Sequence, residues 1–241
     1  MRATIWRLTW ALAFRRRRLL IWNLLVPVLL LVPVVTSGAA AAHRAVVVAV
    51  FVTFFGAYGS CIPLIRDGMT GWAEKVWLTG YGGRRWLAER TLASVAIDWV
   101  QLLPANLLLA LLIGTSASET LALLVATAVA LLFANLLGVL VATLVRALGE
   151  AALGCAVVSL FALHLTGVFR TPAPGSWWAV IEDLSPLRPL HEMWVGTLSG
   201  GPGPVAAVGV LPGLTLVLFL LLTIVVGNRL ARRVAATGSA G

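Results

Sequence analysis

The sequence predicts an all-α integral membrane protein with six membrane-spanning helices. The chain of 241 residues is 60% hydrophobic and only 11% charged, and its mean hydropathy is +0.99. Its charges fall in short clusters, and the apolar runs between them are long enough to cross a bilayer, which takes about 20 residues of helix. We predict spans at about 19–37, 45–65, 92–114, 119–145, 150–169 and 205–227.

The distribution of basic residues orients these spans. Six basic residues precede the first span, five lie between the second and third, one lies between the fourth and fifth, and three follow the sixth. The other connections hold only Arg44, Arg170 and Arg188. Because Lys and Arg concentrate on the cytoplasmic side of membrane proteins, we predict that both termini are cytoplasmic. The sequence therefore indicates a multi-pass protein of the plasma or inner membrane.

The net charge of +9 does not indicate a nucleic-acid partner. Nucleic-acid binding needs a soluble basic surface, whereas here the basic residues flank apolar spans. Membrane lipid is the expected electrostatic partner, because anionic headgroups of the inner leaflet attract the arginine run at 15–18.

The leader at residues 1–18 is predicted to be an interfacial helix. Trp6 and Trp10 are one helical turn apart and alternate with arginines, as in helices that lie at the headgroup level. A frayed extension of the first span is the alternative. A cleaved signal peptide is a further alternative, which would leave five spans, but the apolar run of about 17 residues exceeds the usual 7–15.

The predicted cytoplasmic loop, residues 66–91, is rich in tryptophan. Its middle, from Trp72 to Leu78, is predicted to form a short helix that glycines at 80, 82 and 83 terminate. Trp72, Trp77 and Trp86 suit two roles on composition alone, as interfacial anchors or as contacts for a cytosolic partner.

The predicted external loop, residues 170–204, is divided by prolines, including Pro186, into segments at 177–184 and 190–198 that favour brief amphipathic helices. Trp177, Trp178 and Trp194 suggest that these helices lie on the outer leaflet or dip into it. Two interpretations of this loop remain: a gating cap over a transport pathway, or a surface loop held by aromatic residues.

The motifs exclude most enzymatic functions, and we predict no catalytic residue and no metal site. Lys75 is the only lysine and follows Glu74, so the chain holds no phosphate-binding Gly-Lys-[Ser/Thr] loop. His191 and Glu192 begin like a zinc-protease helix, but the second histidine is missing. Ser159 and His164, five residues apart on one helix, face about 140° away from each other.

Polar residues inside the spans are the candidates for a transport pathway. Asp98, Gln101 and Asn106 share one face of the third span, and a carboxylate inside a membrane is a functional hypothesis by default. Asn135 and His164 are the other pathway candidates, each also explained as a contact between helices. For Asp98, an inter-helix hydrogen bond or a partner such as Arg90 is the competing explanation.

Two short segments resemble the permease subunit of type 2 ATP-binding-cassette (ABC) exporters. Residues 67–80 resemble the family's acidic, Gly-Thr and apolar run that ends in proline, although Gly71-Trp72 replaces Gly-Thr and Gly80 stands at the proline. Leu184-Ser-Pro-Leu resembles the segment before the last span. The predicted topology also resembles that of the family over nearly the whole chain.

The resemblance implies a mechanism with two partners. A separate ATPase subunit, which carries the ATP and Mg²⁺, would dock on loop 66–91, and a second permease half would complete a homodimer or heterodimer. This chain itself then needs no cofactor. The implied ATPase contacts are Asp67, Gly71, Trp72, Glu74, Lys75, Trp77, Arg84 and Arg85.

The cargo implied is lipophilic or amphipathic, such as a drug, natural product, lipid or glycan. Two rival functions remain. A secondary transporter driven by an ion gradient would predict internal repeats with broken helices, and the halves show no convincing repeat. A membrane-embedded enzyme would use Asp98 or His164.

Overall fold

The computed structural model describes residues 4–169, 173, 175–183, 185, 188–199 and 210–238. This part of the chain is built from helices and their connections, without strands. The helices are α1 (Ile5–Arg15), α2 (Arg17–Thr36), α3 (Ala41–Met69), α4 (Trp72–Leu78), α5 (Gly83–Ile113), α6 (Ala117–Leu144), α7 (Leu148–His164), α8 (Trp177–Asp183), α9 (Arg188–Leu198) and α10 (Val210–Gly238).

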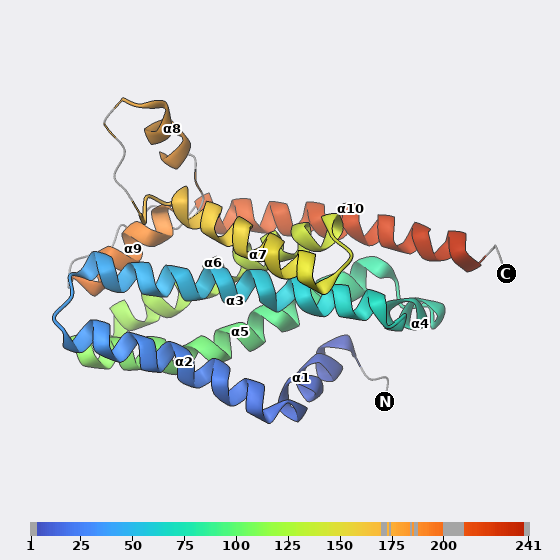
Figure 1. The fold of residues 1–241 in the computed structure, drawn as a ribbon, viewed down its shortest axis with the longest axis horizontal. Coiled ribbons are helices and arrows are strands. Elements are labelled where there is room, and N and C mark those ends of the chain that lie inside the picture. The colour runs from blue at the N-terminus through green and yellow to red at the C-terminus, as the bar shows by residue number, and fades with distance from the viewer. Residues whose placement is uncertain are drawn as a thin grey trace.

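Six of these helices run lengthwise through the molecule (Figure 1): α2, α3, α5, α6, α7 and α10. The short helices α1 and α4 lie at one end together with both chain termini, whereas α8 and α9 lie at the opposite end. The segments that the basic residues assign to the cytoplasm thus gather at a single end of the bundle.

Four helices, α2, α3, α5 and α6, are long and apolar enough to cross a membrane, as judged over the described residues. Two shorter apolar helices, α7 and the stretch Thr215–Arg229 of α10, accompany them. The six helices correspond in order to the six predicted apolar runs, although residues 205–209 of the last run lie outside the described residues. The protein is therefore an all-α integral membrane protein.

Local chemistry sets the ends of several helices. Ser116 and Glu119 form a capping box at the start of α6, each side chain accepting from the other residue's backbone N–H. α5 ends at Gly114, whose φ of 76° is the left-handed conformation that glycine adopts without steric cost. A break at Arg16 separates the amphipathic α1 from the apolar α2.

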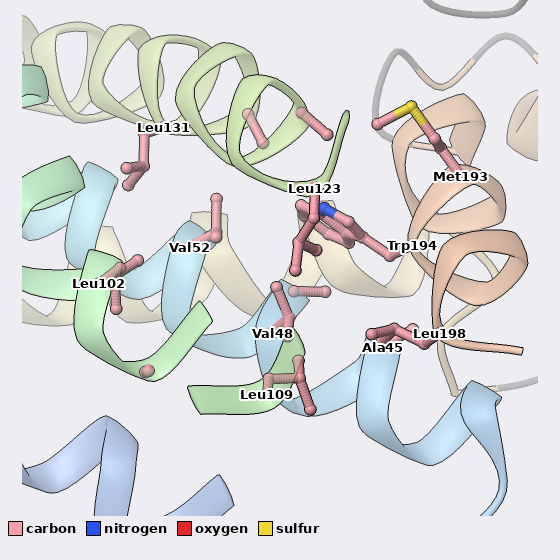
Figure 2. Close-up of a cluster of buried hydrophobic side chains, with 14 of the residues drawn as sticks. Ala45, Val48, Val52, Leu102, Leu109, Leu123, Leu131, Met193, Trp194 and Leu198 are labelled. Carbon is pink, nitrogen blue, oxygen red and sulfur yellow. The ribbon is translucent and has the colours of Figure 1, made fainter. Parts of the chain in front are cut away.

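The main core lies between α3, α5, α6 and α9 (Figure 2). Val48 and Val52 of α3 meet leucines of α5 and α6, and α9 adds Met193, Trp194 and Leu198. Trp194 is only 2% exposed. The sequence suggested that this tryptophan lies at the outer leaflet, but α9 packs against α3 and α6 and carries it into the core.

Helices α3 and α6 approach each other closely because glycines line their contact. A Cβ atom at Gly138 would collide with the backbone carbonyl of Ala57, and one at Gly56 would collide with Ala134. Two helices can pack this closely only where small residues let the backbones meet. The close approach places polar side chains of α3, α5 and α6 within hydrogen-bonding distance.

Candidate functional site

The short helix α4 is fixed to the bundle by its apolar underside. Ala73 is buried, and Trp72, Val76 and Trp77 pack into a cluster with residues of α1, α3, α5, α6 and α10. The ring of Trp77 meets that of Trp86 edge to face, with 5.5 Å between centroids and 89° between planes, a favoured geometry for aromatic pairs. The helix therefore rests on the beginning of α5.

An exposed surface that we call the coupling face is formed by Glu74, Lys75 and Leu78 on the opposite side of α4 and by Met69 at the end of α3. The side chains of Leu78 and Met69 are 79% and 63% exposed, and Glu74 and Lys75 between them are exposed as well. Apolar anchors beside charged residues are typical of protein–protein contacts. Met69 and Leu78 were not among the residues predicted from the sequence, although Leu78 ends α4 and Met69 ends the helix before it.

The other residues that are predicted to contact the ATPase make contacts or turns within this chain. Gly71 has a φ of 62° and makes the turn into α4, while Trp72 and Trp77 lie beneath the helix. Arg84 Nε donates to Asn228 Oδ1 at 2.6 Å. Arg85 is paired with Glu89 at 2.8 Å and lies over the ring of Tyr81.

Asp67 points away from the coupling face and into the bundle. Its Oδ2 accepts from Arg90 Nε at 3.0 Å, and the terminal Nη1 of Arg90 donates to Thr9 Oγ1 at 2.8 Å. One arginine thereby joins α1, α3 and α5. Because both partners of the ion pair are largely buried, the pair organises the base of the helices rather than a surface.

A second polar network lies deeper, at Asp98. Asn135 Nδ2 donates to Asp98 Oδ2 at 3.1 Å and to the carbonyl of Leu131 at 2.9 Å, and the Ser60 hydroxyl donates to Asn135 Oδ1. Gly59 of α3 lies directly against the Asp98 carboxylate, where a Cβ would collide with it. The network joins α3, α5 and α6, so Asp98 makes an inter-helix hydrogen bond and its partner is Asn135, not Arg90.

A cavity of about 200 Å³ connects the two polar clusters. It lies between α1, α2, α3 and α5 and reaches from Arg66 and Arg90 to Asp98 and Gln101. Gln101 Oε1 also accepts from Asn23 Nδ2 of α2 at 3.2 Å. Asp98 and Gln101, two of the predicted pathway residues, therefore line the same space.

The remaining predicted site residues lie elsewhere. Asn106 donates to the carbonyl of Leu102 on its own helix. His164 meets Trp178 edge to face at 5.8 Å, where α7 ends near α8. Trp177 stacks on Trp178 and is 61% exposed, and Pro186 lies outside the described residues.

Helices α8 and α9 hold charged residues that pair with one another. Arg188 forms ion pairs with Asp183 and Glu192, and the hydrogen bond with Glu192 raises its pKa. Burial lowers the pKa of His191, so the neutral imidazole is favoured there. Among the described residues, no three His, Cys, Asp or Glu side chains gather as metal ligands would.

The apolar lengthwise helices, the amphipathic α1 and the exposed short helix at one end define a multi-pass helical membrane protein. The family described as ABC-2 type transporter matches residues 2–198. The chain belongs to this family and is the membrane component, or permease, of an ABC transporter. Such a component is a transport subunit and not itself catalytic, and the family implies an ATP-binding partner.

Comparison with curated proteins gave no match, and comparison with solved structures gave none either. The family match favours ABC transport over the ion-gradient-driven and enzymatic alternatives. It ends at the last residue of α9, before α10 begins.

Proposed function

We propose that this chain is one half of an ABC exporter permease in the cell membrane, moving lipophilic or amphipathic cargo with ATP hydrolysed on a separate subunit. The observation that carries the proposal is the construction of α4. Its outer side exposes the coupling face, and its underside packs on α3, α5 and α10. A subunit that binds the outer side is thereby connected to helices that cross the membrane.

The packing of α4 supports transmission of movement. Trp86 of α5 is 2% exposed and contacts Trp77 of α4, and both belong to the same apolar cluster as the buried Ile5 of α1. Protein interiors are close-packed and transmit strain. When the ATPase subunits close, a displaced α4 therefore carries the beginning of α5 and the interfacial α1 with it.

The apolar faces of α2 and α7 support a second permease half. Only 11% of the most apolar stretch of α2 is buried, against 61% in α6. On α7, Leu153, Val157 and Phe161 are each more than half exposed. Lipid or a second permease half covers such faces in a membrane, and a pathway bordered by them suits lipophilic or amphipathic cargo.

The coupling face is tested by purifying the tagged chain in mild detergent from membranes that contain its natural ATPase partner. We expect the wild-type chain to recover an ATP-binding subunit. Leu78→Ser and Met69→Ser should each weaken recovery about fivefold or more, since interface anchors contribute 1 kcal/mol or more.

Leu144→Ser is the matched control for the recovery experiment. Leu144 is 78% exposed at the end of α6 but does not belong to the coupling face, so its substitution should leave recovery unchanged. Recovery of no ATPase by the wild type, or equal losses in all three variants, would contradict the proposal.

A further inference from the structure

We propose that the cavity between α1, α2, α3 and α5 is a binding site for an anionic glycerophospholipid of the inner leaflet, whose phosphate is held by Arg16 and Arg66. The inference concerns a resident ligand and does not depend on which cargo the transporter moves. It rests on the charge of the lining, the apolar mouth of the cavity and the position of the cavity in the fold.

The lining carries an excess of positive charge. Arg16, Arg66 and Arg90 line the cavity together with two carboxylates, Asp67 and Asp98. The Arg90–Asp67 ion pair neutralises one cation, and the carboxylate of Asp98 is bound to Asn135. Even with both carboxylates charged, one positive charge remains.

The two arginines outside the ion pair, Arg16 and Arg66, line the same cavity. Arg16, which is exposed, and Arg66, which is partly buried, both repel the guanidinium of Arg90 in that cavity. Among the described residues, neither Arg16 nor Arg66 has a carboxylate partner. An anion placed between them removes this repulsion, and phosphate oxygens accept the charge-assisted hydrogen bonds that guanidinium groups donate.

The mouth of the cavity suits an acyl chain. Leu12 of α1 and Leu19 of α2 line it and are 40% and 54% exposed, and Leu20 and Pro63 continue the apolar wall inward. A free phosphate has no apolar part that could contact this surface. A phospholipid fills both parts, because its head meets the arginines and its chains leave between α1 and α2.

The position of the site matches the membrane interface. α1 carries Trp6, Trp10 and Phe14 in successive ring contacts along one face, a pattern of helices that lie at headgroup depth. Another face of the helix holds Ile5 and Thr9, which are buried against the bundle. A lipid beneath this helix would be bound at the level of its neighbours in the leaflet.

The chain itself supplies a matched control. Arg17 and Arg18 belong to the same arginine run and are exposed, but they do not line the cavity. The variants Arg16→Gln/Arg66→Gln and Arg17→Gln/Arg18→Gln therefore remove the same charge from two places. Ala13→Phe fills the cavity from α1 without changing any charge.

The test equilibrates each purified, full-length variant with detergent micelles that contain equal amounts of phosphatidylglycerol and phosphatidylcholine, and counts bound lipids by native mass spectrometry. The wild type should retain phosphatidylglycerol in preference to phosphatidylcholine. Arg16→Gln/Arg66→Gln should bind it about 30-fold more weakly, from about one factor of five per arginine, and Ala13→Phe should lose it.

Several results would overturn the proposal. These are no preference in the wild type, an equal loss in Arg17→Gln/Arg18→Gln, retention by Ala13→Phe, or displacement of the lipid by inorganic phosphate, which would indicate a free-phosphate site. Unchanged thermal unfolding of the variants shows that they fold. Because neither ATP nor the ATPase is present, a failure here is distinct from a failure of the exporter proposal.

Discussion

Arg90 of α5 and Asp67 of α3 form an ion pair, with 3.0 Å between Nε and Oδ2, in which the two side chains are only 9% and 13% exposed. The pair lies beside the cavity and reaches α1 through Thr9. A carboxylate that the sequence offered as an ATPase contact thus stabilises the base of the helix bundle.

We expect Arg90→Met to lower the free energy of unfolding by about 3 kcal/mol, because it leaves the Asp67 carboxylate buried without its partner. Denaturant titration in mixed micelles measures the change. Arg85→Met is the control, since Arg85 pairs with Glu89 in an exposed position, where ion pairs contribute little. Equal stability of the two variants would show that the buried pair has no structural role.

Gly138→Ala should destabilise the protein by about 1–3 kcal/mol, the usual cost of overpacking, because the added Cβ collides with the carbonyl of Ala57. The same substitution at Gly149 of α7 meets no atom within 4 Å. It should be neutral or stabilise by up to about 1 kcal/mol, since alanine favours helix. Unfolding titrations of the two variants, run side by side, decide whether α3 and α6 meet at Gly138.

Gly71→Ala should cost about 1–2 kcal/mol, because an L-residue is disfavoured in the left-handed conformation that starts α4. It should also reduce ATPase stimulation by the permease, since the turn sets the direction of the helix. Gly82→Ala, where φ is −57° and the added Cβ has free space, should leave both measurements unchanged. Full ATPase stimulation by the Gly71→Ala variant would show that the turn at Gly71 is not needed for coupling.

Asp98→Asn should keep the fold, because an asparagine oxygen can still accept from Asn135. Asp98→Leu should lose about 1–3 kcal/mol of stability, since it leaves one of the two N–H groups of the buried Asn135 amide without an acceptor, while the other still donates to the carbonyl of Leu131. A transport assay on the stable Asp98→Asn variant then tests the function of the charge. Normal transport is the expected result if Asp98 acts in packing, and loss of transport would assign the carboxylate to the pathway.

Cysteine labelling tests the orientation. Cys61 and Cys155 are buried and free, and replacing both with alanine gives a background for single cysteines. In intact cells, an impermeant maleimide should label Trp177→Cys but not Lys75→Cys, and inside-out vesicles should give the reverse. Labelling of position 75 from outside would overturn both the orientation and the coupling role of α4.

The sequence indicated the elements better than it indicated their faces. Apolar runs between charge clusters located the long helices, and the glycines around Trp72 to Leu78 indicated the short helix that the structure shows at those bounds. The sequence does not indicate which face of a helix packs against another when the helix is apolar on all sides, because the hydrophobic residues then show no helical periodicity. Trp194 is the clearest example, since a tryptophan in an outer loop suits both the membrane surface and the core that it occupies.

The polar residues were recognised as a set but not as pairs. Asp98 and Asn135 are 37 positions apart, and Arg90 and Asp67 are 23 apart. Only the packing of α3, α5 and α6 determines which polar side chains form hydrogen bonds with each other. The exposed Leu78 and Met69 were missed because apolar residues are too common in this chain to distinguish a contact surface from a span.

The glycine seam between α3 and α6 restricts how this permease can change shape. Where backbones touch, no side chain can switch rotamer to let one helix slide past the other, and interfaces of this kind shift as blocks. The two helices must therefore move together as one rigid body. Any passage through the membrane therefore has to open at a helix contact without such a glycine seam. The contact of α2 with α5 is an example, where Asn23 donates a hydrogen bond to Gln101.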